Sequence, residues 1–475
     1  MLNLSRIKSI YHIAICGTGM ASLAAMLKNR GYRVIGSDEN VYPPMSTFLE
    51  EQAIPIYQGF DAEHIRQEKP DLVVIGNAMS RGNPEVEFVL NEKIPYISLP
   101  AALREFFIRG RYSCVVTGTH GKTTTTSMLA WVLQSAGLQP GLFVGGLPEN
   151  FGRGFQLGDG PHFVIEGDEY DSAFFDKGPK FLHYMPDLLI INNIEFDHAD
   201  IYRNLDEIKT MFRRLVRIVP SRGHIIANAD DPVVQEVVQP CYSNLHAFGR
   251  SAAAEWRADE IAHTETGSRF VIQHRGETVA EAEIALWGEH NVQNALAVFV
   301  AATQLGLRPE HILKGLRTFR GVRRRLTRIG EVDGMVIFDD FAHHATAIKE
   351  TLKAVRSHFP SRRIWAIFEP RTASAKRKVF EKQFYAAFDG VDRVIIAPLH
   401  RPDKVPEAER LSVERILNAL RDKAIPAESI APGEPMLAYL SEHAESGDVF
   451  VFMSNGDFNS MPTKLWHVLN HKRGQ

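Results

Sequence analysis

The sequence predicts an α/β protein of three domains, each built around a mainly parallel sheet. The chain has 475 residues, which at about 150 residues per domain corresponds to about three domains. Short apolar runs alternate with glycine-containing turns and helical stretches, the pattern of β-α-β units. This pattern starts anew near Gly110 and near Gly321, so we expect domains over residues 1–109, 110–319 and 320–475.

Each domain contributes apolar runs that read as buried strands. The expected strands cover residues 12–15, 32–35 and 71–75 in the first domain, 113–116, 163–165 and 188–191 in the second, and 336–338, 364–368, 394–396 and 449–452 in the third. Helices are expected over residues 20–28 and 123–136, because each follows a glycine turn and lacks strand-like alternation.

The composition excludes several classes of protein. Lys plus Arg is 54 and Asp plus Glu is 57, so the net charge of −3 excludes a broadly basic nucleic-acid binder. Three cysteines without a C-x-x-C pair exclude a disulfide scaffold and argue against a cysteine-based zinc site. No signal peptide and no run of about 20 apolar residues is found. We therefore expect a cytoplasmic protein with neither nucleic acid nor membrane as partner, and no oligomeric state follows from these counts.

The most informative local pattern is a glycine-rich turn between an apolar strand and a helix. It reads Gly118-Thr119-His120-Gly121-Lys122-Thr123-Thr124. Glycines let backbone N–H groups close around phosphate oxygens, and the start of the helix adds a positive end. Lys122 supplies charge for the terminal phosphates, and the Thr123 hydroxyl suits Mg²⁺. Two residues separate the glycines, where the usual P-loop has four, so an ordinary strand-to-helix turn is the alternative.

Two further polar clusters follow apolar runs of the same domain. One is Glu166-Gly167-Asp168-Glu169-Tyr170-Asp171, and the other is Asn192-Asn193-Ile194-Glu195-Phe196-Asp197-His198. The carboxyl ends of parallel strands are where α/β folds bind ligands, and carboxylate oxygens suit Mg²⁺. Taken alone, residues 166–171 are also consistent with a solvated acidic loop. His198 is also consistent with an ordinary histidine on the surface. One magnesium-nucleotide site would account for all three clusters together.

The first domain carries a weaker nucleotide signal. Gly17-Thr18-Gly19-Met20 is part of a G-x-G-x-x-G pattern, and Asp38 ends the next expected strand, where dinucleotide-binding folds place an acid for ribose. On spacing alone, a nicotinamide cofactor is one interpretation. The glycine-rich turn at residues 118–124 argues against a dehydrogenase, because hydride transfer does not require a triphosphate.

Charged residues follow turns and strands of the third domain. Arg325 belongs to a cationic turn, Asp340 follows the strand expected at residues 336–338, and Arg371 follows the one at 364–368. The functional interpretations are a clamp on phosphate, a contact with a nucleotide sugar and a grip on a substrate carboxylate. A solvated charge run and ordinary loop residues are the alternatives. Asn291 and Asn294, before the third domain, are expected to cap a helix near its start.

Together these motifs resemble the Mur ligase family, the ATP-dependent enzymes that join amino acids or peptides to UDP-N-acetylmuramate. The resemblance covers essentially the whole chain, in order: the short P-loop at 118–124, Glu166, Asn193-x-Glu195-x-Asp197-His198, His290-Asn291-x-x-Asn294, the Arg325 turn and Asp340. It implies a Rossmann-like N-terminal domain for the UDP-sugar and a P-loop ATPase-like central domain for ATP. It also implies a Rossmann-like C-terminal domain that receives the incoming substrate and closes over the nucleotide.

The resemblance also implies roles for individual residues. ATP would be bound by Gly118, Thr119, His120, Gly121, Lys122, Thr123, Thr124, Asn291, Asn294, Arg325 and Asp340. The UDP-sugar would be bound by Gly17, Thr18, Gly19, Met20, Ser37, Asp38, Asn77 and Ser80, and the peptide by Arg371. Mg²⁺ would be held by Thr123, Glu166 and His198, and the catalytic residues would be Lys122, Glu166, His198 and Arg325. This full set disfavours a non-catalytic nucleotide-binding regulator.

Within the family, the chain resembles the branch that adds to the bare UDP-muramate carboxylate. One member adds free L-alanine, and another reattaches the tripeptide L-alanyl-γ-D-glutamyl-meso-diaminopimelate. Residues 41–47, 76–84, 166–177 and 453–456 resemble the tripeptide-adding member. The alanine-adding member usually has Ser-Asp in place of Tyr170-Asp171 and Tyr-Gly in place of Phe341-Ala342. We therefore expect the tripeptide-adding activity, with the alanine-adding one as the alternative.

One departure concerns a second Mg²⁺. Many family members carry a carboxylated lysine after the His198 motif, whereas this chain reads Met211-Phe212-Arg213-Arg214. The alanine-adding branch lacks this lysine too, so the departure fits the branch and leaves the ligands of a second ion open.

Overall fold

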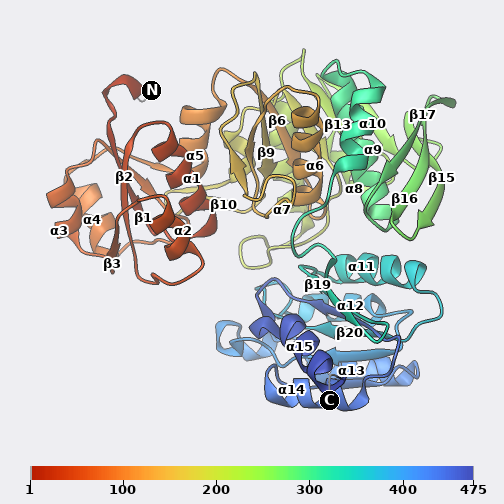
Figure 1. Cartoon of the computed structure of the whole chain (residues 1–475). Helices are drawn as coiled ribbons and strands as arrows, with labels where there is room; N and C mark the ends of the chain where they lie inside the picture. Colours follow the sequence, from red (N-terminus) through yellow and green to blue (C-terminus); the bar gives the residue numbers. More distant parts are fainter. Residues whose placement is uncertain (1–2, 474–475) are drawn as a thin grey trace. The chain divides into compact units, whose positions relative to one another are not determined.

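The computed structural model describes residues 3–473, and within that range the strands form three large sheets and a small two-stranded one (Figure 1). The described residues divide into two compact units. The first comprises the chain up to Glu195, Asp206–Arg257 and Leu296–Leu316, and the second comprises Phe196–Leu205, Ala258–Ala295 and the chain from Arg317 onward. The α/β class with mainly parallel sheets is confirmed, while the limits at residues 109 and 319 stay predictions.

A five-stranded parallel sheet in the order β3-β2-β1-β4-β5 forms the N-terminal part of the first unit. Its strands are β1 (Ser9–Ile13), β2 (Arg33–Asp38), β3 (Ile56–Gln58), β4 (Leu72–Ile75) and β5 (Tyr96–Ser98). The helices between and after them are α1 (Thr18–Asn29), α2 (Met45–Glu51), α3 (Ala62–Glu68), α4 (Pro84–Asn91) and α5 (Leu99–Leu103). Apolar side chains of β1 and β4 pack against α3 and α4 on one face, and α1 and α5 cover the other (Figure 1).

Strand β1 lies earlier in the chain than predicted. The apolar run continues to Ile15, but Ala14 has a φ of 65°, which turns the chain out of the strand. The backbone N–H of Ile15 then donates to the carbonyl of Ser37 at the end of β2 (3.0 Å). The apolar run therefore extends two residues beyond the end of β1. Its last residue, Ile15, is buried in the turn that follows the strand and not in the sheet.

The central sheet has the order β17-β16-β15-β14-β13-β12-β6-β9-β7-β8. Its strands are β6 (Tyr112–Thr117), β7 (Gly141–Phe143), β8 (Phe155–Gln156), β9 (His162–Gly167), β12 (Leu188–Ile191), β13 (His224–Asn228), β14 (Asn244–Gly249), β15 (Trp256–Thr264), β16 (Gly267–His274) and β17 (Glu277–Ile284). The two-stranded sheet consists of β10 (Asp171–Ala173) and β11 (Asp176–Pro179). The helices are α6 (Lys122–Ser135), α7 (Leu205–Arg217), α8 (Pro232–Val237), α9 (Glu289–Gln304) and α10 (Pro309–Thr318).

Antiparallel pairs lie at both ends of this sheet, β7 with β8 and β16 with β17, and were not predicted. Strands β16 and β17 pair antiparallel across a two-residue turn, Arg275-Gly276, in which both residues have positive φ. A glycine at such a turn is a recognised hairpin signal. The strand before the turn contains the short apolar run Phe270-Val271-Ile272, whereas Glu281 and Glu283 interrupt the apolar residues of the strand after it.

The C-terminal sheet lies in the second unit and has the order β18-β19-β23-β20-β21-β22, parallel except for β18. Its strands are β18 (Thr327–Val332), β19 (Met335–Asp340), β20 (Ile364–Phe368), β21 (Arg393–Ile396), β22 (Ala427–Ser429) and β23 (Val449–Met453). On one face pack α11 (Ala345–His358), α12 (Glu381–Ala387) and α13 (Val413–Asp422), and on the other α14 (Glu434–His443) and α15 (Met461–Arg473) (Figure 1). Among the described residues, no helix combines the length and the apolar character needed to cross a membrane.

A buried histidine in β1 makes the stability of the fold depend on pH. His12 is fully buried, and neither ring nitrogen has a hydrogen-bond partner among residues 3–473. Burial lowers the pKa of His12 from 6.5 to about 3. An unfolded chain therefore binds a proton at His12 below pH 6.5 that the folded protein does not. The stability is full above pH 6.5 and is lost as the pH falls toward 3.

We expect His12→Leu to weaken this pH dependence. At pH 5 the wild-type protein should have lost about 2 kcal/mol through His12, and the variant should not. The measurement is the urea midpoint of both proteins at pH 7.5 and pH 5, with His467→Gln, at an exposed histidine, as the control. Equal shifts of the midpoint in wild type and His12→Leu would contradict the assignment.

Candidate active site

The three polar clusters of the central domain follow neighbouring strands. The sheet order places β6 between β9 and β12. The parallel register aligns Thr117 of β6 with Gly167 of β9 and with Ile191 of β12. Because the strands run in the same direction and end in register, the residues that follow them emerge at one edge of the sheet. The prediction that the clusters share a sheet edge is confirmed.

The turn between β6 and α6 is a glycine loop with a fixed shape. Gly118 has a φ of 135° and Gly121 a φ of 79°, both unfavourable for other residues. A Cβ atom at Gly118 would lie 3.0 Å from the backbone N and O of Asn193, so this approach also requires glycine. The Asn193 Oδ1 accepts from the backbone N–H of His120 (2.7 Å), and the Asn193 carbonyl accepts from that of Thr119 (3.0 Å). The segment after β12 therefore holds the loop from one side.

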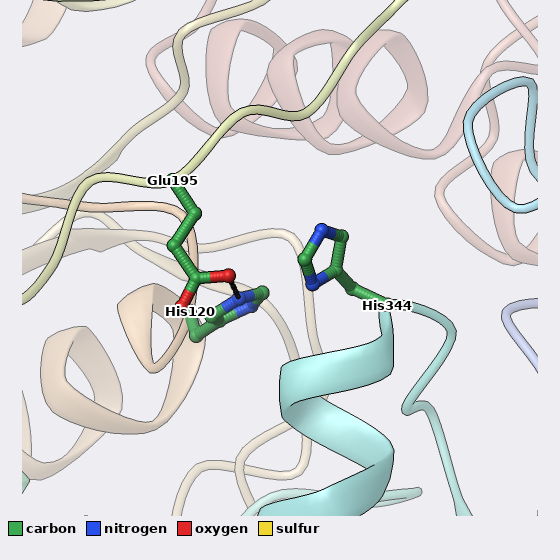
Figure 2. A group of neighbouring side chains, drawn as sticks. All are labelled: His120, Glu195 and His344. Carbon is green, nitrogen blue, oxygen red and sulfur yellow. Dashed lines mark ion pairs between the residues drawn. The ribbon is translucent and has the colours of Figure 1, made fainter. Parts of the chain in front are cut away.

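A second brace joins the same two segments. The Thr119 hydroxyl accepts from the backbone N–H of Glu195 (2.8 Å), and Nε2 of His120 lies 3.5 Å from a Glu195 carboxylate oxygen (Figure 2). The loop predicted to contact phosphate and the polar stretch that follows β12 are thus joined by short contacts. The geometry is that of a preformed loop.

The ammonium of Lys122 lies at the start of α6 beneath this loop. It donates to the Gly118 carbonyl (2.6 Å) and forms an ion pair with the buried carboxylate of Glu169 (2.9 Å). Burial alone would lower the pKa of Lys122, but the carboxylates of Glu169 and Asp168 outweigh it and raise the pKa above its ordinary value. The side chain is therefore charged at neutral pH, as phosphate binding requires.

The donor set for Mg²⁺ next to Lys122 fits that ion. The Thr123 hydroxyl donates to Oε1 of Glu166 (2.8 Å), and Oε2 of Glu166 accepts from the backbone N–H of Gly145 (2.8 Å). A hydroxyl and a carboxylate in contact are hard oxygen ligands of the kind that Mg²⁺ prefers. Thr123 comes from the first turn of α6 and Glu166 from the end of β9, so two rigid elements position them.

The rest of the acidic stretch is paired, which overturns the alternative of a solvated acidic loop. Asp168 forms an ion pair with Lys180 (2.5 Å) and Asp171 with Lys177 (2.6 Å). Glu169, which the sequence did not single out, is the ion-pair partner of Lys122. Its position in the stretch was visible in the sequence, but a contact across 47 residues was not.

The predicted UDP-sugar residues lie after three neighbouring strands, β1, β2 and β4. Gly17 precedes α1, whose first residues are Thr18, Gly19 and Met20; Ser37 and Asp38 end β2; and Asn77 and Ser80 follow β4. A carboxylate oxygen of Asp38 accepts from the backbone N–H of Cys16 (2.9 Å), so this acid holds the glycine loop. Residues 77 and 80 are partly or fully exposed. Their binding of a UDP-sugar stays a prediction.

A residue that the sequence did not indicate, Glu85, lies behind this edge. Its fully buried carboxylate accepts from the hydroxyls of Tyr11 (2.9 Å) and Ser37 (2.5 Å) and lies 3.0 Å from Nδ1 of His64. The carboxylate thus fixes the side chain of Ser37. Asn83-Pro84 marks the start of α4, but nothing in the sequence showed that the third residue would be buried.

In the second unit, Asn291 and Asn294 lie inside α9 and not at its cap. The helix begins at Glu289, so the prediction that these residues cap it is wrong. Asn291 donates through Nδ2 to the Trp287 carbonyl (2.8 Å), and Asn294 donates to Oδ1 of Asn291 (3.3 Å). The two amides form a small network on the first turns of the helix, with the Asn294 residue 7% exposed.

The cationic turn before β18 is held by aromatic and acidic side chains. The guanidinium of Arg325 lies 4.9 Å from the centre of the Phe341 ring, and that of Arg324 lies 5.4 Å from it. Asp340, which is buried, accepts from the backbone N–H groups of Leu326 (2.6 Å) and Ala342 (2.7 Å). Burial raises the pKa of Asp340 although Arg325 acts against it. Asp340 therefore holds the turn that carries Arg325, and its contact with ribose stays a prediction.

The segment with His198 packs within the second unit. Asp197 is buried and accepts a hydrogen bond from the Ser374 hydroxyl. The rings of Phe196 and Phe380 stack with their centres 5.5 Å apart. Burial alone would raise the pKa of Asp197, but His198, His343, the Ser374 hydroxyl and His344 lower it below its ordinary value. His344, at the start of α11 (Figure 2), accepts from the backbone N–H of Thr346 (3.4 Å). The role of His198 as a metal ligand stays a prediction.

Arg371 lies just past β20, as predicted, and is only loosely paired. Its Nη1 lies 3.7 Å from Glu369 and 3.9 Å from Asp457. The buried Glu369 already accepts from the Ser454 hydroxyl (2.6 Å). The guanidinium is partly exposed and is available to a ligand at this end of the sheet.

Comparison with known families gives three successive matches. The model described as "Mur ligase family, catalytic domain" matches residues 9–111, "Mur ligase middle domain" matches residues 116–302, and "Mur ligase, glutamate ligase domain" matches residues 324–456. Each match covers one of the three large sheets or most of it.

Three known proteins show how similar the chain is to its relatives. The UDP-N-acetylmuramate–L-alanyl-γ-D-glutamyl-meso-2,6-diaminoheptandioate ligase of Escherichia coli K12 is 42% identical over 98% of this chain and 98% of its own. The UDP-N-acetylmuramate–L-alanine ligase of Acetivibrio thermocellus is 34% identical over 96% of this chain and 95% of its own. The crystal structure of a murein peptide ligase from Psychrobacter arcticus has a TM-score of 0.71 at 34% identity, covering 97% of this chain and 98% of that one.

Proposed function

Because the chain belongs to the Mur ligase family, we propose that it joins L-alanyl-γ-D-glutamyl-meso-diaminopimelate to UDP-N-acetylmuramate at the expense of ATP. The observation that carries the choice of substrate is the full-length similarity to a ligase of that name. Its identity exceeds that of the alanine-adding relative over nearly the same residues.

The reaction needs ATP because a carboxylate and an amine do not condense in neutral water. In the first step, an oxygen of the muramate lactyl carboxylate attacks the γ-phosphorus, and the bond to ADP breaks. In the second step, the α-amine of the peptide attacks the acyl carbon, loses a proton, and phosphate leaves. Both steps build up charge on phosphate oxygens, so the protein acts mainly by positioning and by charge stabilisation.

The first unit would bind the phosphates. The loop at 118–121 offers backbone N–H groups at the start of α6, and Lys122 would neutralise the terminal phosphates. Thr123 and Glu166 would hold Mg²⁺, and His198, whose segment packs within the second unit, would hold a second ion. When bound, Mg²⁺ neutralises phosphate charge and orients the γ-phosphoryl group.

The second unit would supply the remaining contacts. We assign Asn291 and Asn294 to the adenine, Asp340 to the ribose, Arg325 to the γ-phosphate and Arg371 to the incoming peptide. For these residues to act on the nucleotide that Lys122 binds, the C-terminal domain must close over it during the reaction. The loops after β1, β2 and β4 would hold the UDP-sugar. Since ATP and UDP-sugars are cytoplasmic metabolites, we also assign the protein to the cytoplasm.

The proposal predicts which acceptor supports phosphate release. With ATP, Mg²⁺ and UDP-N-acetylmuramate present, we expect release of phosphate with the tripeptide and only background release with free L-alanine. The reason is that an enzyme uses contacts with the distal part of a substrate to orient its reacting end. A coupled phosphate assay measures both rates, and mass spectrometry of the product identifies the new amide.

Omitting UDP-N-acetylmuramate is the control for uncoupled ATP hydrolysis. Release with L-alanine but not with the tripeptide would make this the alanine-adding ligase. Release with neither acceptor would contradict both activities.

A further inference from the structure

A group of cationic side chains lies at the carboxyl end of the C-terminal sheet. Arg371 follows β20, and Arg401 follows β21, the next strand in the sheet. Lys376 lies on the segment that begins at Arg371. The backbone N–H of His400 donates to the Pro370 carbonyl (3.4 Å), so the two segments are joined. These residues lie where open α/β sheets bind ligands.

Lys376 is unusual because most of its side chain is buried and its ammonium has no bonded partner. The residue is only 6% exposed. No hydrogen bond or ion pair joins its ammonium to another residue in the described part of the chain, from 3 to 473. Its backbone is fixed, since its N–H donates to the Thr372 carbonyl (3.3 Å) and its own carbonyl accepts from Leu411 (2.8 Å). A lysine this little exposed, with no ion pair or hydrogen bond for its ammonium, is uncommon in proteins.

The neighbours of Lys376 increase this excess of positive charge. Burial lowers the pKa of Lys376, and the charges of Arg401, Arg371 and Arg377 lower it further, against Asp403 alone. Arg377 is neutralised by an ion pair with Glu409. Arg371 has only the two long ion pairs already described, and Arg401 has none that the structure records within residues 3–473. The acid that acts on Lys376, Asp403, is exposed, and the two acids near Arg371 lie 3.7 Å and 3.9 Å from it.

We propose that Lys376, with Arg371 and Arg401, binds a carboxylate of the incoming peptide that lies beyond its alanyl residue. This inference rests on the proposed function and adds the group that the site recognises. The tripeptide carries one free carboxylate on its glutamyl residue and two on its diaminopimelyl residue. Free L-alanine has no carboxylate so far from its amine.

The surroundings favour a peptide carboxylate over a phosphate group of the nucleotide. A phosphate site in this fold uses the backbone N–H groups of a glycine loop, as at residues 118–121. The segment at 371–377 has no glycine. It presents side-chain cations instead, with the buried Oδ1 of Asn455, after β23 on the other side of β20, as an acceptor without a partner in the described chain. Cations and a free acceptor together suit a zwitterionic peptide.

The test compares Lys376→Met with the wild-type enzyme in the phosphate-release assay. Methionine keeps much of the length of the side chain and removes its charge. We expect the KM for the tripeptide to rise about tenfold or more, the usual consequence of losing a charged hydrogen bond. The KM values for ATP and UDP-N-acetylmuramate should not change. Lys378→Met, at an exposed lysine two residues away, is the matched control and should behave as wild type.

Two peptide analogues identify the carboxylate. In one, the glutamyl carboxylate is a carboxamide, and in the other both diaminopimelyl carboxylates are. For the wild type, we expect one analogue to have a raised KM, and for Lys376→Met this penalty should largely disappear, because the partner of the lost charge is the group that was changed. If Lys376→Met adds the same factor to all three peptides, the proposal is wrong.

Three further readouts keep the test decisive. The melting temperature of Lys376→Met should equal or exceed that of wild type, since the substitution breaks no ion pair or hydrogen bond of the ammonium recorded in residues 3–473 and removes its repulsion by Arg401 and Arg371. Lys376→Arg should recover part of the affinity for the tripeptide.

A raised KM for ATP with an unchanged KM for the tripeptide would place a nucleotide phosphate here and overturn the proposal. If the wild type itself releases no phosphate with the tripeptide, the proposed function fails; if it does and Lys376→Met matches it, only this inference fails.

Discussion

Replacing Lys122 with alanine is expected to abolish phosphate release while UDP-N-acetylmuramate still binds. The ammonium is held at the start of α6 by the Gly118 carbonyl and by Glu169, where it can act on the terminal phosphates of a nucleotide. Losing a charge that stabilises the transition state of phosphoryl transfer costs at least about 10³-fold in rate. The predicted UDP-sugar residues follow a different sheet, so that binding should survive, as measured by titration calorimetry.

The same substitution also affects the fold, and a second variant separates the two effects. Lys122→Ala leaves the buried carboxylate of Glu169 without its partner, which costs about 3–5 kcal/mol of stability. The double variant Lys122→Ala/Glu169→Gln removes that charge as well, so its melting temperature should return toward wild type while its activity stays lost. Recovery of activity in the double variant would show that Lys122 acts only in folding. Loss of UDP-N-acetylmuramate binding by a folded variant would argue against separate sites.

Replacing Glu166 with glutamine is expected to raise the Mg²⁺ concentration needed for half-maximal activity by about 10- to 100-fold. Glutamine keeps the size of the side chain, and its carbonyl oxygen can still accept from the Gly145 N–H. It removes the negative charge next to the Thr123 hydroxyl, so the effect reports on the cation and not on packing. The measurement is phosphate release as a function of Mg²⁺ at saturating ATP.

Asp168→Asn is the matched control, because Asp168 belongs to the same stretch but is paired with Lys180. Its Mg²⁺ titration should resemble that of wild type. An unchanged titration for Glu166→Gln would move the ligand to Asp168 or Glu169.

The parts of the fold predicted best are the buried parallel strands. β12 and β20 have the bounds that their apolar runs predicted, because a strand covered on both faces must be apolar throughout. The apolar runs also predicted the edge of the central sheet at which the candidate site lies, because each run is followed by polar residues. The family, too, is confirmed by the full-length matches.

What the sequence did not reveal depends on contacts between distant residues. The burial of Glu85 depends on two hydroxyls 48 and 74 residues away in the chain. The pairing of Lys122 with Glu169 and the isolation of Lys376 are likewise properties of the packed protein. The early end of β1 depends on one backbone angle at Ala14, which no residue type in that run demanded.

The register between β6 and β9 has a consequence for how this protein can change in length. Side chains alternate between the two faces of a strand, so one residue inserted inside β9 would send Glu166 to the opposite face and break its contact with Thr123. A residue inserted in a surface loop between the two strands does not change which face of β9 carries Glu166. We therefore expect the activity to survive changes in the length of these loops, and to be lost on a single-residue insertion or deletion in either strand.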